Sequence, residues 1–139
     1  MKPETGDEAL DAVLHAAHRV RTGVDARLRD DGLSLPRYKL LKALAVESRS
    51  MREVSDLMGI APRTVTDIID GLEASGLVAR VPHASDRRVT LLELTDAGRK
   101  RLAEARCRAD AVTAEVMVGL NRTERATLVG LLTRVAPLG

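Results

Sequence analysis

The sequence predicts a mostly helical protein with a small β-hairpin. Only one of its 139 residues is aromatic, a tyrosine, whereas 45% are hydrophobic. Strands favour aromatic and β-branched residues, so this composition argues against an all-β protein. Apolar residues recur at spacings of three and four up to Ala74, change to an extended pattern from Leu77, and return to a helical pattern after Thr95. We expect a single domain over residues 1–139.

The first helix is predicted from about Asp7 to Arg29. Its apolar positions follow the helical period and are Leu10, Val13, Leu14, Ala17, Val20, Val24 and Leu28. Gly23 interrupts this stripe and should weaken the helix by about 1 kcal/mol relative to alanine. The sequence Asp30-Asp31-Gly32 ends the helix.

A second helix should begin after Ser34, which is a favourable N-cap residue. Pro36 would lie in the first turn, where its missing N–H does no harm. The inner face of this helix is predicted to consist of Tyr38, Leu41, Leu44 and Ala45.

Two short helices follow with the spacing of a helix-turn-helix. Ser50-Met-Arg-Glu53 reads as a capping box for the first of them, whose predicted buried side is Val54, Leu57 and Met58. Gly59 is placed to end that helix in a left-handed turn. Pro62 opens the next helix, which continues through Ala74 and is followed by Gly76. Only residues 59–61 separate the two helices, which is typical of this motif.

The extended region predicts a hairpin with a long tip. Residues 77–81 and 89–94 are strand-like, and the polar segment 82–88 joins them. Thr95 then caps a long helix, about Asp96 to Gly119, with apolar positions at Leu102, Ala105, Ala109, Val112, Val116 and Leu120. Asn121-Arg-Thr-Glu124 resembles a capping box and opens a final helix that ends near Pro137.

Charge and cysteine content restrict the class of protein. The formal net charge is only +2, so a nucleic-acid surface would depend on where the arginines are placed. The single Cys107 cannot form an internal disulfide, which fits a reducing compartment. The N-terminal residues do not resemble a signal peptide, and no apolar run is long enough to span a membrane. We expect a cytoplasmic protein without membrane contact.

The fourth helix carries residues suited to DNA. Val65, Ile68, Ile69 and Leu72 make its apolar face, and the other sides carry Arg63, Thr64, Thr66 and Asp67. Arginine can fork onto guanine, and threonine can contact phosphate or a thymine methyl group. Ser50 and Arg52 could contact the backbone alongside. The competing interpretation is an ordinary amphipathic surface helix.

The hairpin tip adds a second candidate contact. Asp86-Arg87-Arg88 places two guanidinium groups on a protruding element, and a narrow minor groove attracts arginine. The alternative is a solvated turn with an incidental charge pair.

These motifs resemble the MarR family of bacterial regulators over nearly the whole chain. The most specific pieces are Leu72-Glu-Ala-Ser-Gly-Leu-Val, Asp86-Arg-Arg-Val and Leu94-Thr-Asp-Ala-Gly; Leu33 to Leu41, Val54 to Ile60 and Thr64-Val-Thr also match. The resemblance implies a winged helix-turn-helix over about residues 34–95. It also implies dimerisation helices over about residues 7–31 and 96–137, and a homodimer that binds pseudo-palindromic operators on double-stranded DNA. By position, Arg88 would be the minor-groove residue and Asp86 its orienting partner.

One position departs from the family pattern. Many relatives carry arginine where this chain has Asp67. A carboxylate cannot bind phosphate, although it could accept from a cytosine amino group or pair with a nearby arginine. More of the base reading should then depend on Arg63.

The resemblance also implies a small aromatic or acidic effector. Our candidate effector residues are His15, His18, Arg19 and Tyr38; of these, His15 and Arg19 share a helix face and could hold a carboxylate. A solvated helix face and a core tyrosine are equally compatible with the pattern. Redox sensing through Cys107 is a further alternative, because arginines flank this thiol on both sides.

No catalytic motif accompanies these features. The sequence lacks a glycine-rich phosphate loop or a paired-carboxylate motif, and three histidines with one cysteine offer little for a metal site, so we expect neither an enzyme nor a cofactor. The prediction is a DNA-binding transcriptional regulator, with a ligand-responsive repressor as its specific form. The alternative from another class is a helical protein-interaction module without DNA binding, which leaves the arginine-tipped hairpin unexplained.

Overall fold

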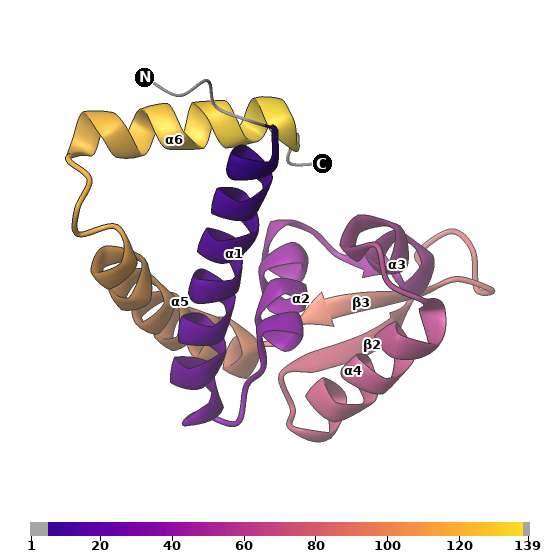
Figure 1. Ribbon diagram of the computed structural model, residues 1–139. Coiled ribbons are helices and arrows are strands. Elements are labelled where there is room, and N and C mark those ends of the chain that lie inside the picture. The colour runs from indigo at the N-terminus through magenta and orange to yellow at the C-terminus, as the bar shows by residue number, and fades with distance from the viewer. Residues whose placement is uncertain (1–5, 138–139) are drawn as a thin grey trace, which may run out of the picture.

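The computed structural model describes residues 6–137 and contains six helices and three short strands among them (Figure 1). In chain order the elements are α1 Gly6–Arg29, α2 Leu35–Val46, β1 Arg49–Ser50, α3 Met51–Met58, α4 Pro62–Ala74, β2 Val78–Pro82, β3 Thr90–Leu94, α5 Asp96–Val116 and α6 Arg122–Val135. The mostly helical prediction is confirmed, with element ends shifted by a few residues. Within the described residues, no helix is both long and apolar enough to cross a membrane.

The sheet contains one strand more than the predicted hairpin. Its antiparallel order is β1-β3-β2, with Val78 opposite Leu94 and Pro82 opposite Thr90 across the hairpin. The two-residue strand β1 adds the pair Arg49–Leu92 on the other side of β3. So short a strand has no alternating pattern that a sequence could reveal.

The core is aliphatic and lies where α2, α3, α4, the sheet and α5 converge. Nine of its largest side chains are fully buried: Leu28, Leu40, Leu41, Val54, Val65, Ile69, Leu72, Val78 and Leu92. Along α1 only Val24 and Leu28 are buried, and α6 has no buried residue. In Figure 1, α6 lies across the N-terminal end of α1, away from the remaining elements.

Local capping follows the sequence at three helices. The side chains of Ser34 and Thr95 accept from backbone N–H groups at 3.4 and 3.0 Å, and Asn121 with Glu124 forms the complete reciprocal box. At α3, Ser50 Oγ accepts from Glu53 N at 3.2 Å, and no return bond from Glu53 is present in the described structure. The capping box predicted there is therefore half formed. Leu57 was also wrongly assigned to the buried side, since it is 43% exposed.

Thr95 and Gly98 fasten the start of α5 to the base of the hairpin. Thr95 Oγ1 donates to the Gly76 carbonyl at 2.7 Å, and Thr95 N donates to the Leu77 carbonyl at 3.1 Å. A Cβ atom added at Gly98 would lie 2.1 Å from the Leu77 oxygen, so only glycine allows this approach. The residues just before the hairpin, Gly76 and Leu77, and those just after it, Thr95 and Gly98, thus contact one another directly.

The apolar stripe of α5 packs on α1 of the same chain. Leu102, Ala105, Ala109 and Val112 are buried along this stripe. A Cβ at Gly23 would lie 2.9 Å from Val112 Cγ1. Gly23 therefore permits close packing of the two helices, in return for the helix-propensity loss expected from the sequence.

Tyr38 is a buried titratable group whose ionisation can be followed by absorbance without interference from another tyrosine or a tryptophan. Burial raises the pKa of Tyr38 above its usual 10.0, with a smaller lowering effect from Arg106 and a smaller raising effect from Asp110. The chain has no tryptophan or second tyrosine. We expect the 295 nm absorbance of the native protein to rise only above pH 10, and that of the urea-unfolded chain to rise near pH 10.

The same shift predicts a stability effect. The folded state binds the Tyr38 proton more tightly than the unfolded state, so this contribution is complete below pH 10 and is lost as the pH rises towards the folded-state pKa. Tyr38→Phe should remove this alkaline component from urea unfolding curves measured between pH 9 and 11. Coincident native and unfolded titrations would contradict the effect of burial.

Candidate nucleic-acid interface

The outward face of α4 is defined by the residues opposite its buried side. Val65, Ile69 and Leu72 are fully buried. Arg63 and Asp67 lie two residues to either side of Val65, which places them roughly 200° around the helix from it. Both are exposed. The first two turns of α4 therefore present one guanidinium and one carboxylate directly away from the protein.

Some of the other residues predicted to contact DNA already make hydrogen bonds within the protein, and others do not. Thr66 is exposed, but its hydroxyl donates to the Pro62 carbonyl at 3.0 Å. The hydroxyl of Ser50 already serves as the α3 cap, whereas Arg52 is exposed one residue into α3. Thr64 is exposed and also lines a cavity beside α4.

Arg80 on β2 connects the hairpin to the second half of α4. Its guanidinium donates to Asp70 Oδ1 and to Glu73 Oε1, both at 2.7 Å. The hydrogen bond to Asp70, with further contributions from the two negative charges, raises the pKa of Arg80 above its usual value. Arg80 thus pairs with two carboxylates of α4 and fixes the helix against the hairpin.

The hairpin tip is held in a defined conformation by Asp86 and His83. Asp86 Oδ1 accepts from the Arg88 backbone N at 3.1 Å and from Arg88 Nε at 3.2 Å. Nδ1 of His83 lies 3.1 Å from Ser85 N and 3.2 Å from Asp86 N, within hydrogen-bonding distance of both N–H donors. The Arg88 side chain is nevertheless 91% exposed. The tip projects past α3, so it presents this guanidinium on a constrained loop (Figure 1).

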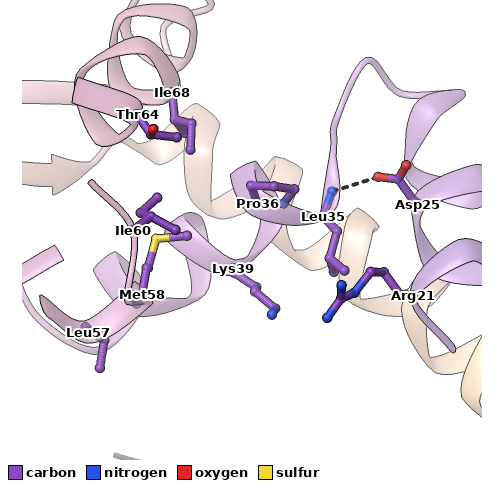
Figure 2. A pocket seen from close by; sticks show the side chains of 11 residues that line it. Arg21, Asp25, Leu35, Pro36, Lys39, Leu57, Met58, Ile60, Thr64 and Ile68 are labelled. Carbon is purple, nitrogen blue, oxygen red and sulfur yellow. Dashed lines mark hydrogen bonds between the residues drawn. The ribbon is translucent and has the colours of Figure 1, made fainter. Parts of the chain in front are cut away.

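A cavity of about 530 Å³ separates α1 and α2 from the helix-turn-helix. Figure 2 shows Arg21 and Lys39 on one side of it and Met58, Ile60 and Ile68 on the other. Asp25 also lines it, but its carboxylate accepts from Leu35 N at 3.0 Å and lies 3.3 Å from the Arg29 guanidinium. Within residues 6–137, neither Arg21 nor Lys39 takes part in an ion pair. The cavity therefore combines uncompensated positive charge with an apolar wall.

Comparison with known proteins places this architecture in a family. Residues 31–89 match the model of the MarR family. The chain belongs to the MarR family. It is 30% identical over 105 residues to the uncharacterized HTH-type transcriptional regulator YdgJ of Bacillus subtilis. The aligned residues make up 75% of this chain and 64% of YdgJ. The chain thus spans somewhat less than two thirds of that relative.

Solved structures agree over almost the whole length. A MarR-family transcriptional regulator from Rhodococcus sp. RHA1 superposes with a TM-score of 0.86 at 24% identity, covering 99% of this chain and all of the other. BpsR of Bordetella bronchiseptica superposes with a TM-score of 0.82 at 28% identity, covering 97% and 98% of the two chains. Its structure is described as a mechanism by which 6-hydroxynicotinic acid regulates DNA binding.

In this MarR-family chain, the residues proposed from the sequence for an effector do not gather. His15, His18 and Arg19 are exposed on α1, and Tyr38 is buried with Lys42 Nζ 5.1 Å from its ring centroid. None of the four lines the cavity beside the helix-turn-helix. The periodicity of α1 alone could not distinguish the side of Arg21 from the side of Arg19.

Cys107 is exposed on α5. Of its two flanking arginines, Arg108 is committed elsewhere, since its Nε lies 2.7 Å from Asp31 Oδ2. Redox sensing by Cys107 stays a prediction.

Sequence reasoning missed the supporting residues of the interface. Arg80 was missed because a polar residue in a strand of alternating polar and apolar residues gives no indication of a partner. Its partners Asp70 and Glu73 precede it by ten and seven residues. The sequence prediction gave His83 no role at the hairpin tip. The carboxylates of α4 followed by an arginine in the adjacent strand were the available signal for Arg80.

Proposed function

We propose that this MarR-family protein is a sequence-specific DNA-binding transcriptional regulator that acts as a homodimer on pseudo-palindromic operators. The observation that carries the proposal is the pairing of an outward-facing Arg63 on α4 with Arg88 on a constrained hairpin tip. An arginine at the start of a helix suits the major groove, and an arginine on a projecting loop suits the minor groove. Thr64, Thr66, Ser50, Arg52 and Arg87 are proposed as additional contacts.

A titration by fluorescence anisotropy tests this proposal. Labelled duplexes from the upstream region of the protein's own gene are compared with a shuffled duplex at moderate salt. We expect binding to the upstream region to be at least about a thousandfold tighter, because specific protein–DNA complexes exceed non-specific ones by that factor or more. Equal affinity for both duplexes would contradict a regulator and favour an interaction module.

Arg88→Ala provides the sharpest test of the hairpin tip. Removing one phosphate-like contact should lower operator affinity and reduce the slope of log K against log salt by about 0.9 per tip. Asp86→Asn is the informative companion, since it removes the negative charge and leaves only a neutral amide oxygen to accept from Arg88. Weaker binding by Asp86→Asn would indicate orientation; tighter binding would indicate that only net charge matters. An unchanged affinity and slope in Arg88→Ala would remove the tip from the interface.

The homodimer is supported by apolar surface on α1 and α6. Large side chains are exposed along both helices: Leu10, Val13, Leu14, Val129, Leu131, Leu132 and Val135. Val13 and Leu132 line a common apolar cavity of about 690 Å³. A second copy of the chain is the partner that would cover this surface on every molecule.

We further propose that a small aromatic or acidic effector occupies the cavity beside the helix-turn-helix and releases repression. Arg21 and Lys39 would bind its carboxylate, and Met58, Ile60 and Ile68 would contact its apolar part. BpsR, whose DNA binding responds to 6-hydroxynicotinic acid, is a relative with an effector of this chemistry. Calorimetry with a panel of aromatic carboxylates, using Arg21→Ala and the exposed Arg19→Ala as a matched pair, tests the assignment. Equal loss of binding in both variants would reject it.

A further inference from the structure

Asp67 stands apart from the other carboxylates of α4. The helix carries Asp67, Asp70 and Glu73, and Arg80 binds the last two at 2.7 Å each. Asp67 is exposed and takes part in no ion pair among residues 6–137. In the second half of α4 both carboxylates are therefore paired with Arg80, whereas Asp67 in the first half has no ion-pair partner among the described residues.

The position of Asp67 places it beside the proposed base-reading residue. Arg63 and Asp67 are four residues apart, so they are neighbours on one helix face, and both point away from the buried Val65. A helix that inserts its N-terminal half into the major groove brings this face to the base edges. The carboxylate of Asp67 would then face base edges. It would not contact the phosphates, because they would repel it.

The chemistry of a carboxylate restricts which base it can face. Ionised aspartate only accepts hydrogen bonds, whereas thymine O4 and guanine O6 and N7 are themselves acceptors. Adenine offers its N6 amino group but places the N7 acceptor next to it. Cytosine offers its N4 amino group with no neighbouring acceptor on that edge.

We propose that Asp67 is a specificity-determining residue that accepts a hydrogen bond from the N4 amino group of a cytosine, one in each half-site. The same charge weakens contact with every other sequence, so Asp67 lowers non-specific affinity while it raises selectivity. The inference rests on the proposed function, because it requires α4 to enter the major groove.

Selection from a library of random duplexes, followed by sequencing of the bound DNA, tests the inference. The wild-type protein should enrich a half-site with cytosine at one position, preferred over thymine by on the order of tenfold. Asp67→Asn should move the preference at that position from cytosine to adenine, since asparagine pairs with adenine N6 and N7. Asp67→Ala should abolish the preference there and bind random duplex several-fold more tightly.

Glu104→Gln is the matched control, because it removes an exposed carboxylate from α5 and should leave every base preference unchanged. An enriched wild-type site whose preferences are the same in Asp67→Asn would overturn the inference and leave the proposed function intact. A wild-type protein that enriches no sequence at all would overturn the proposed function, and the inference with it. Circular dichroism of each variant confirms that the exposed substitutions leave the fold unchanged.

Discussion

Replacing Gly98 with alanine is expected to lower the free energy of unfolding by about 3 kcal/mol or more. The added Cβ would lie 2.1 Å from the Leu77 carbonyl oxygen and 2.7 Å from Leu94 Cδ1. The first of these atoms belongs to the backbone, so it cannot rotate away as a side chain could. Either α5 moves off the hairpin base or the Thr95–Leu77 hydrogen bond breaks.

Gly130→Ala is the matched control for Gly98→Ala. Gly130 lies within α6, and a Cβ there meets nothing within 4 Å. Helix propensity alone should then stabilise this variant by roughly 0.5–1 kcal/mol. Urea unfolding followed by circular dichroism, at one protein concentration for all variants, measures both changes. A Gly98→Ala protein as stable as the wild type would mean that α5 can move away from the base of the hairpin without lowering the free energy of unfolding.

Leu132→Asp is expected to convert the proposed homodimer into monomers. The 14-residue α6 has no buried residue, and a helix of that length is marginal in water without tertiary packing. Leu132 is 41% exposed and lines the apolar cavity shared with α1. An aspartate there would have to be buried without a partner when a second chain covers this surface, which strongly opposes association.

Sedimentation velocity distinguishes the two states of this variant. The wild type should sediment at twice the 15.0 kDa chain mass, and Leu132→Asp at the chain mass. Ala126→Asp introduces the same charge on α6 about 120° around the helix from Leu132 and should remain dimeric. The monomeric variant should also lose most of its operator affinity, because one chain reads one half-site. A wild-type protein that is a stable, folded monomer would contradict the homodimer.

The elements of the fold could be predicted because their signals are local. Ser34, Thr95 and Asn121 cap helices through hydrogen bonds that span only three residues. Gly59 ends α3 with a φ of 64°, which lies in the left-handed region that favours glycine. Strand β1 was missed because its two residues are ordered by pairing with β3, over 40 positions later.

The candidate site was predictable only in part. The Asp86–Arg88 pair lies within one loop, so residues two apart could be matched from sequence. The cavity beside the helix-turn-helix is lined by residues of four helices, and no spacing within α1 could favour Arg21 over Arg19.

The sequence by itself determined the helices, the hairpin and the two arginines that project from them, because capping, periodicity and turn chemistry act between residues close in the chain. The tertiary structure decided three further properties: which α4 carboxylate has no ion-pair partner among the described residues, which cationic side chains face a cavity, and why Gly98 is needed. Each depends on atoms from separate elements brought within a few ångströms, and such contacts arise only when the core has assembled.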